Sequence, residues 1–430
     1  MKRAKLLIVG QVVCLTLIVL SLYLGRDRLT RLRVPSFHEH DDPDSPATAT
    51  GPPNQTSTSA TPFKSALLGG DRIATYIDAI MDANSTVLPR LECPPFPVAR
   101  YEYLKLRHGD SAPIQFFFAL DLRECLDLLP RLIGSVVEAI RYLGPKQCAL
   151  SIIEGPSNDG TGQVLAALRP ALDALTTTYY FKSTSVSSKV GDRIARLAEL
   201  RNMALQPMLD DKSRYSTNTT VIFLNDVAIC LDDILELVHQ RRSLGADMTC
   251  AMDWTYAGAN PTFYDVWVAR TIKGDAFFDI PPDGNWNSAW NLFWNDAGTQ
   301  SRFTAHQPFQ VFSCWNGAVT FTAKPIIEKT ITFRAARTDV GECFQGEPML
   351  FAKDLWFHGY NKIATIPSVN LEYTDGNGKR IKDDKGYTSR LVGEGHTDER
   401  IEWQLEPPAQ VRCQPNWENQ FWQPWNTGLT

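Results

Sequence analysis

The sequence predicts an α/β fold in which a parallel or mixed sheet carries helices on both faces. Between residues 110 and 255, short apolar runs typical of buried strands alternate with segments whose apolar residues recur at helical spacing. Strands joined through helices form such sheets because each crossover helix covers one face. The 430 residues are 43% hydrophobic and 21% charged, which permits a large core and excludes wholesale disorder and a polytopic membrane protein.

The expected strands are short apolar runs, rich in β-branched and aromatic residues, that end at polar or turn-forming residues. The run IQFFFAL at 114–120 is the first of them. In chain order, the strands are expected at 114–120, 148–153, 221–224, 247–252, 318–321 and near 362–367. Beyond Trp254 the alternation gives way to aromatic, Asn-rich and Gly-rich chain.

The expected helices carry one apolar stripe and stop at residues that favour helix ends, as the pattern at 123–143 does at Gly144-Pro145. In chain order, the helices are expected at 72–81, 123–143, 162–175, 192–208, 232–241 and within 342–356. Trp286, Trp290 and Trp294 follow one another at a spacing of four residues. In a helix they would share one face, and we expect that face to pack in the core.

The N-terminal region has the composition of a membrane anchor followed by a stem. Residues 6–24 are uncharged and as a helix would extend about 28 Å, close to the roughly 30 Å of a hydrocarbon core. We expect a transmembrane signal anchor rather than a cleaved signal peptide, whose apolar region is usually shorter. Residues 1–5 are then a cytoplasmic tail, residues 25–66 a disordered stem rich in Pro, Ser and Thr, and residues 67–430 the folded body.

Sequons, cysteines and charge bear on the compartment and the partners. The sequons at Asn54, Asn84 and Asn218 can be glycosylated only in the secretory lumen. Eight cysteines lie outside residues 6–24, an even number that suits disulfides there, although their pairing is open and a free buried thiol is the simpler expectation for Cys250. The first 33 residues carry a net charge of +6 and the rest −11, and so acidic a body argues against a nucleic-acid partner.

The strongest local motif is TVIFLNDVAIC at 220–230, where an apolar strand ends at Asn225-Asp226. Ligands of open α/β sheets bind at the carboxyl ends of strands. The Asp226 carboxylate there is suited to a divalent cation such as Mn²⁺ or Mg²⁺, with Asn225 as a neutral oxygen ligand. The alternative is that the two residues cap the next turn.

Two further motifs precede that strand. Arg201 lies on the apolar stripe of the helix expected at 192–208, four residues after Leu197 and four before Leu205. Because a guanidinium facing the core needs an anion, either a buried carboxylate or a ligand phosphate must meet it. Asp159 lies in the turn EGPSNDGTG, which either approaches a ribose or phosphate or simply caps the following helix.

The second half of the chain offers aromatic and acidic candidates. Trp315 and Asn316 directly precede the strand expected at 318–321, and a tryptophan ring there could stack on a ring-shaped ligand. Glu347 opens a short helix and is placed to accept a hydrogen bond or act as a base, unless it only complements the helix N-terminus. Asp354 lies on the same helix.

Taken together, these blocks resemble the fungal alpha-1,3-mannosyltransferase family that includes the cryptococcal capsule-associated mannosyltransferases. They occur in order between residues 192 and 373, with weaker similarity from about residue 114. The matching blocks are DRIARLAELRNMALQP, VIFLNDVAIC, ADMTCAMDW, FYDVWVAR, PFQVFSCWNGAVTF, GECFQGEPMLFAKDLW and IPSVNLEY.

The resemblance implies a single-pass type II Golgi membrane protein with a luminal catalytic domain of the GT-A-like nucleotide-sugar transferase fold. It implies transfer of mannose from GDP-mannose to a mannose-containing glycan, with an alpha-1,3 linkage, retention of configuration and help from Mn²⁺ or Mg²⁺. The donor half would span about 110–255 and the acceptor half about 256–430. Two alternatives stay open: transfer from another nucleotide sugar such as UDP-xylose, and a non-catalytic luminal subunit that binds glycans or assembles complexes.

The motifs and the resemblance together assign a role to each candidate residue. Asp226 would bind the metal, and Asn225 stands where a full Asp-x-Asp motif has an acid, so strict metal dependence stays open. His358 and His396 are further candidates for metal ligands, although a solvent-exposed or capping histidine is the simpler expectation for both. The expected roles are catalysis for Asp226 and Glu347, donor binding for Asp159, Arg201, Asn202 and Asn225, and acceptor binding for Trp315, Asn316 and Asp354.

Overall fold

The computed structural model describes residues 68–105, 113–329, 331–395 and 397–429, all within one compact unit. The predicted cytoplasmic tail, membrane anchor and stem, with Asn54, lie outside the described residues, and so does His396. Within the described ranges, no helix combines the length and the apolar character needed to cross a bilayer.

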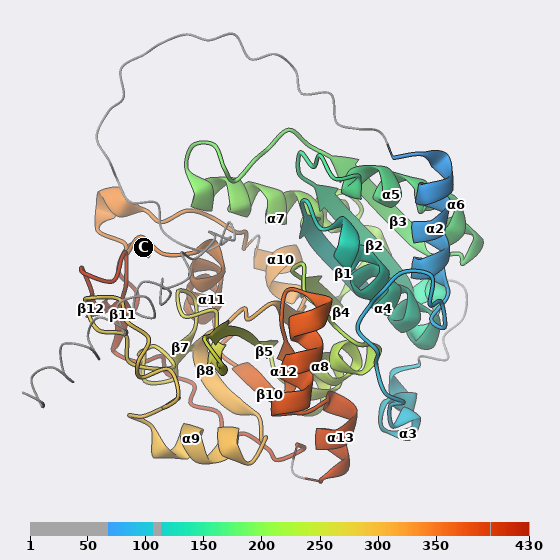
Figure 1. Ribbon diagram of the computed structural model, residues 1–430. Coiled ribbons are helices and arrows are strands. Elements are labelled where there is room, and N and C mark those ends of the chain that lie inside the picture. Colours follow the sequence, from blue (N-terminus) through green and yellow to red (C-terminus); the bar gives the residue numbers. More distant parts are fainter. Residues whose placement is uncertain (1–67, 106–112, 330, 396, 430) are drawn as a thin grey trace, which may run out of the picture. The chain divides into compact units, whose positions relative to one another are not determined.

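Among the described residues, ten strands form one mixed sheet, which confirms the predicted α/β class (Figure 1). They are β1 (Ile114–Leu122), β2 (Cys148–Glu154), β3 (Thr178–Ser183), β4 (Tyr215–Leu224), β5 (Met248–Ala257), β6 (Asn260–Phe263), β7 (Arg270–Thr271), β8 (Phe309–Ser313), β9 (Ala318–Thr322) and β10 (Ile363–Leu371). The order is β3-β2-β1-β4-β9-β5-β10-β8-β7, with β6 paired to β5. Strands β3, β2, β1 and β4 are parallel to one another, whereas β9 is antiparallel to both β4 and β5.

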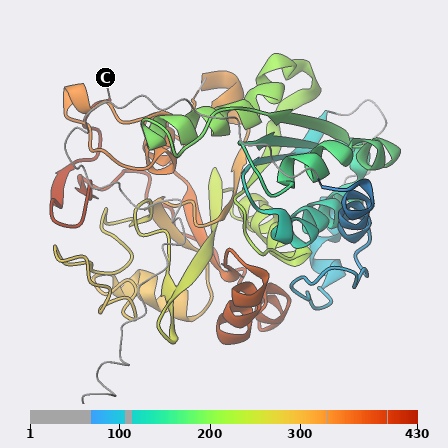
Figure 2. The ribbon, with the colours of Figure 1, turned by 45° about the horizontal axis from the view of Figure 1, so that its top comes forward.

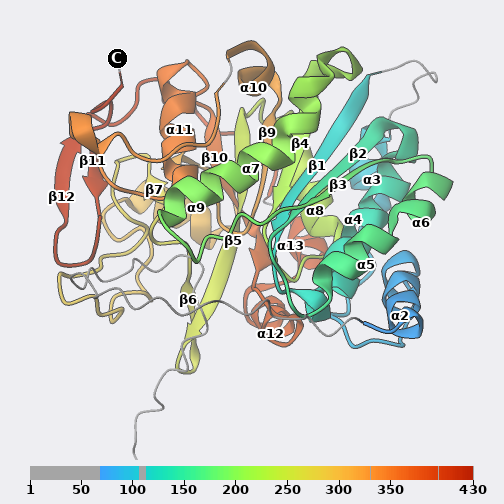
Figure 3. The same ribbon diagram turned by 90° about the horizontal axis from the view of Figure 1, so that it is seen from above.

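Helices cover both faces of this sheet, as predicted. They include α2 (Gly70–Met81), α4 (Leu129–Leu143), α7 (Arg193–Asp210), α8 (Leu231–Ser243), α10 (Lys324–Lys329), α11 (Glu347–Phe357), α12 (Asp375–Lys385) and α13 (Thr388–Gly393). Helix α7 packs on β1 and β2, α10 on β4 and α11 on β8, whereas α8, α12 and α13 pack on β10. Figure 3 shows α7 lying across the strands.

Side-chain alternation along the strands builds one core on each face. In β1, Phe117 packs with the apolar residues of α7, whereas Phe116 and Phe118 pack with those of α4 and α8. This is the period of two that a strand imposes. The remaining elements are α3 (Val98–Tyr101), α5 (Thr161–Ala167), α6 (Arg169–Ala174), α9 (Ala297–Thr304) and a separate ribbon of β11 (Gln410–Cys413) and β12 (Phe421–Pro424). The ribbon, in red, and α2, in blue, lie at opposite sides in Figure 2.

All the expected strands and most expected helices are present, with shifted ends. Strand β3 was not predicted, because it is an edge strand whose last residues, Lys182 and Ser183, are exposed and polar. The helix expected at 162–175 divides into α5 and α6, since Pro170 occupies the first turn of α6.

The predicted helical stripe of Trp286, Trp290 and Trp294 is wrong. Residues 281–296 form turns and no helix, and the backbone has positive φ at Gly284 and Phe293, which a helix cannot accommodate. Trp290 is 81% exposed, whereas Trp286 packs edge-on against Phe278.

Disulfides form at three places in the described part of the chain: Cys93–Cys230, Cys250–Cys314 and Cys343–Cys413. The expectation of a free thiol at Cys250 is therefore wrong, because the turn after β8 brings Cys314 next to this strand residue in the core. Cys125 and Cys148 are the buried free cysteines of the described residues.

Candidate functional site

The carboxyl ends of β1 and β4 lie side by side at the centre of the parallel part of the sheet. From β1 the chain passes outward to β2 and β3 on one side, and β4 returns on the other side of β1. Such a reversal of strand order is where open α/β sheets bind ligands. Leu120 of β1 pairs with Leu224 of β4, so Asp121 and the Asn225-Asp226 turn lie at this position.

Arg201 and Glu347 form a buried ion pair beside these strand ends. The Nε of Arg201, on α7, donates to Oε1 of Glu347, the first residue of α11, over 2.7 Å. Arg201 is 6% exposed and Glu347 2%. Of the two anions that the sequence allowed for Arg201, the structure shows the buried carboxylate, and it joins two residues predicted separately.

Two opposing effects act on the pKa of Glu347. Burial raises the pKa of Glu347, and the charge and hydrogen bond of Arg201 act in the opposite direction. Nη1 of Arg201 also lies 4.0 Å from Oδ1 of Asp121 at the end of β1. Arg201 therefore stands between two carboxylates from distant parts of the chain, which positions α7 against both β1 and α11.

Asn225 and Trp315 complete the same cluster. Oδ1 of Asn225 accepts hydrogen bonds from Nε1 of Trp315 at 2.9 Å and from Nη1 of Arg201 at 3.4 Å. The guanidinium lies 4.5 Å from the centre of the Trp315 ring, and Phe223 and Phe333 pack against that ring edge-on. Trp315 is only 1% exposed, so in this conformation its faces contact protein and not solvent.

Asn316 shapes the turn that follows Trp315. Its backbone has φ +55° and its side chain is fully buried, with Nδ2 donating to the carbonyl of Ala251 and its amide to Oδ2 of Asp265. The next residue, Gly317, has φ +78°, and a Cβ there would lie 3.0 Å from Val227. Its carbonyl accepts from the amide of Asn225, so this turn holds the Asn225-Asp226 loop in place.

Three predicted residues, Asn202, Asp159 and Asp354, make their hydrogen bonds outside the Arg201–Glu347 cluster. Asn202 exchanges two hydrogen bonds with the backbone of Phe333. Asp159 accepts from the amides of Leu126 and Thr161 and from the Thr161 hydroxyl, which is the capping arrangement that the sequence allowed. Asp354 forms a two-pronged ion pair with Arg334.

The other predicted sites lie on the surface. Asn84 and Asn218 are both exposed, and their glycosylation stays a prediction. His358 is exposed and follows the end of α11. Asp226 is partly exposed at the strand end.

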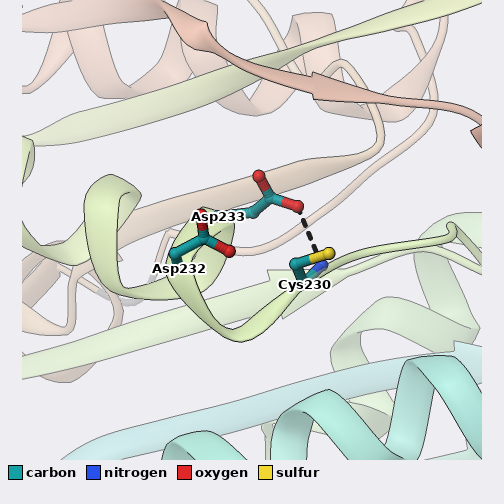
Figure 4. A group of neighbouring side chains, drawn as sticks. All are labelled: Cys230, Asp232 and Asp233. Carbon is teal, nitrogen blue, oxygen red and sulfur yellow. Dashed lines mark hydrogen bonds between the residues drawn. The ribbon is translucent and has the colours of Figure 1, made fainter. Parts of the chain in front are cut away.

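A group of three potential metal ligands, Cys230, Asp232 and Asp233, lies at the start of α8 (Figure 4). Its chemistry does not suit a metal. Cys230 is joined to Cys93, and its amide donates to Asp233, the bond drawn in Figure 4. Asp233 also forms a fully buried ion pair with Lys382 and accepts from Thr388. We infer that this group ties α8 to α12 and α13.

Stability should depend on pH through Asp232. Burial, and next the Asp233 carboxylate, raises the pKa of Asp232 to about 7. Because this value exceeds that of the unfolded chain, the stabilising contribution is present at low pH and is lost as the pH rises through about 7. Asp232→Asn keeps an oxygen acceptor for the Ser389 amide. In urea unfolding we expect the variant to lose less stability than the wild type between about pH 5 and pH 8, by on the order of 1 kcal/mol or more; equal losses would contradict the assignment.

Sequence reasoning missed four polar residues farther along the same sheet edge: Asp253, Tyr264, Asp265 and Tyr373. Asp253, fully buried in the middle of β5, accepts a 2.7 Å hydrogen bond from the hydroxyl of Tyr373, which follows β10. Asp265 accepts from Asn316. The signal was the one used for Asp226, an acid at the end of an apolar strand run, and it also marks Asp121 and Asp253.

Comparisons with known proteins agree on one family. The model of the family described as Cryptococcal mannosyltransferase 1 matches residues 115–354. Alpha-1,3-mannosyltransferase CMT1 of Cryptococcus neoformans var. neoformans is 36% identical over 352 residues, which cover 75% of this chain and 74% of that protein.

Among solved structures, the similarity is distant. The mannosyltransferase PcManGT from Pyrobaculum calidifontis, in complex with GDP-Man and Mn²⁺, has 13% identity and a TM-score of 0.36, covering 64% of this chain and 62% of that one. TarS from S. aureus has 12% identity and a TM-score of 0.35, with 60% of each chain covered. The matched part spans less than two thirds of either solved chain.

Proposed function

Since this chain belongs to the cryptococcal mannosyltransferase family, we propose that it is an alpha-1,3-mannosyltransferase that transfers mannose from GDP-mannose to a mannose-containing glycan. The observation that carries the proposal is the relationship itself, 36% identity over 75% of the chain. The residues of the Arg201–Glu347 cluster, with Asp121 and Asp226, all fall within the family-matched range of 115–354. The predicted family is thus confirmed.

The donor diphosphate would bind at the ends of β1 and β4, in a GT-A-like arrangement. A Mg²⁺ or Mn²⁺ ion that bridges a diphosphate needs only one or two protein carboxylates, because phosphate oxygens and water complete its shell. The partly exposed Asp226 fits that requirement. The ion would offset negative charge on the leaving GDP. An acidic body, with net charge −11 beyond residue 33, has particular need of such local positive charge.

The buried residues around Asp226 would hold the site in shape. Asn225, engaged by Trp315 and Arg201, fixes the backbone from which Asp226 projects. Glu347, paired with Arg201, adds a carboxylate behind the strand ends. We further propose retention of the alpha configuration, and a type II Golgi setting in which residues 6–24 form the anchor. The uncharged run, the stem composition and the sequons support that setting.

The direct test incubates the purified full chain with labelled GDP-mannose, Mn²⁺ and mannobiose. We expect a trisaccharide whose new linkage is alpha-1,3 by NMR, and little product from UDP-xylose in a donor panel. If the protein transfers no sugar, yet GDP with Mn²⁺ raises its melting temperature, it binds the donor without turnover. If there is neither transfer nor a shift, the proposed activity is wrong.

A further inference from the structure

Two partly exposed tyrosines form an aromatic pair in the acceptor half of the sheet edge. The ring centres of Tyr264 and Tyr373 lie 5.0 Å apart with a tilt of 59°. Both side chains are partly exposed, whereas every residue of β10, the strand that precedes Tyr373, is buried. No role has so far been assigned to either residue.

The pair is held rigidly. The hydroxyl of Tyr373 donates to Oδ2 of Asp253 over 2.7 Å, and the amide of Tyr264 donates to the backbone carbonyl of the same Asp253. Leu371, two residues before Tyr373, is the β-sheet partner of Asp253. One buried residue therefore fixes both tyrosines, and such preorganisation lowers the entropy lost when a ligand binds.

The pair also adjoins the loop that carries Asp226. The amide of Ala228, two residues after Asp226, donates to the carbonyl of Glu372 over 2.7 Å. A Cβ on Gly317 would be met by Val227, Asp253 and Leu371, so these residues surround the same turn. Asp226 and the tyrosine pair thus lie on neighbouring segments at one edge of the sheet.

The position along that edge separates the pair from the donor nucleotide. The reversal of strand order lies between β1 and β4, where a nucleotide would bind. Tyr264 follows β6, which pairs with β5, and Tyr373 follows β10. Both β5 and β10 lie on the far side of β9 from β4. A group bound against them would therefore lie beyond the sugar end of the donor, where the acceptor must approach.

The chemistry of the pair suits a hexose. A mannose ring has an apolar face of C–H groups that packs against an aromatic face, and rigid tyrosines supply such area at low entropic cost. Trp315, the aromatic residue first expected to do this, is enclosed by Arg201, Phe223 and Phe333. Next to the Asp226 loop, the two tyrosines instead offer partly exposed aromatic surface.

We propose that Tyr264 and Tyr373 form the subsite that binds the terminal mannose of the acceptor glycan, with Asp253 as the residue that positions Tyr373. This proposal rests on the proposed function and specifies the residues that select its acceptor.

The test compares Tyr264→Leu and Tyr373→Leu with the wild-type full chain at saturating GDP-mannose and varied mannobiose. We expect the KM for mannobiose to rise about tenfold in each variant, the loss of one aromatic contact. The KM for GDP-mannose and the slow hydrolysis of GDP-mannose without acceptor should change less than about twofold. Tyr264→Phe keeps the ring and should restore the wild-type KM, whereas Tyr373→Phe should raise it about threefold because it loses only the bond to Asp253.

A matched control is Tyr103→Leu, since Tyr103 is half exposed but contacts His239, which lies in the second half of α8. It should leave both KM values unchanged. Folded variants with an unchanged KM for mannobiose, or with a raised KM for GDP-mannose alone, would overturn the subsite. If the wild type shows no transfer, the proposed function fails independently of the subsite. The binding of mannobiose, followed by NMR, then tests the subsite. Loss of binding in Tyr264→Leu supports the subsite, and retained binding refutes it.

Discussion

Arg201→Met is expected to lower the free energy of unfolding by about 3–5 kcal/mol and to abolish transfer. The substitution leaves Glu347 buried at 2% exposure without the guanidinium that offsets its burial. It also removes the cation from the face of Trp315 and one donor from Asn225, so the Asn225-Asp226 loop loses support. Urea unfolding measures the stability, and the mannobiose assay the activity.

Arg196→Met is the matched control, because Arg196 lies on the same helix and pairs with Glu199 at the surface. Both side chains of this pair are well exposed, so the change should cost no more than about 0.5 kcal/mol and leave activity intact. The double variant Arg201→Met/Glu347→Leu should recover much of the stability but none of the activity, since it removes the unpaired charge. Equal stability of Arg201→Met and Arg196→Met would show that the buried pair is not structurally important.

Asp226→Ala is expected to reduce transfer by about 100-fold to 1000-fold with little change in stability, because the cation and the diphosphate charge it offsets contribute several kcal/mol at the transition state. The side chain is partly exposed, so its loss leaves no large cavity. The rate is measured with labelled GDP-mannose over a range of Mn²⁺ concentrations, and chelation of the metal from the wild type should reproduce the loss.

Asp339→Ala is the control for charge alone, since Asp339 is an exposed acid in a surface turn. It should leave the rate and its dependence on Mn²⁺ unchanged. Full activity of Asp226→Ala in the presence of Mn²⁺ would place the cation elsewhere.

The fold was predictable where local pattern decided structure. Strands such as 114–120 and 148–153 are continuous apolar runs, and burial on both faces of a sheet requires that pattern. Prediction from this pattern fails for segments that are only partly buried or that turns interrupt. Strand β3 ends in exposed polar residues at the sheet edge, and the tryptophans at 286–294 have helical spacing but lie in turns that positive φ angles interrupt.

The sequence indicated which residues belong to the site, but not which of them contact one another. The spacing around Arg201 required an anion, yet Glu347 is 146 residues away in sequence, and only the packing of α11 on α7 brings the two together. Conversely, Trp315 has the sequence context of a ligand-stacking residue, but its ring turns inward onto Arg201. Spacing identifies which side chains need partners, whereas tertiary contacts decide which partner each one has.

The place of β9 in the sheet has a consequence for how the chain is made. Consecutive strands β4 and β5 are not neighbours, because β9, synthesised about 65 residues after β5, inserts between them. Until β9 arrives, one edge of β4 and one edge of β5 have no partner, and unpaired edges invite aggregation. A fragment that ends at residue 257 would keep those edges open permanently. The sheet can therefore be completed only after both halves of the body have been synthesised.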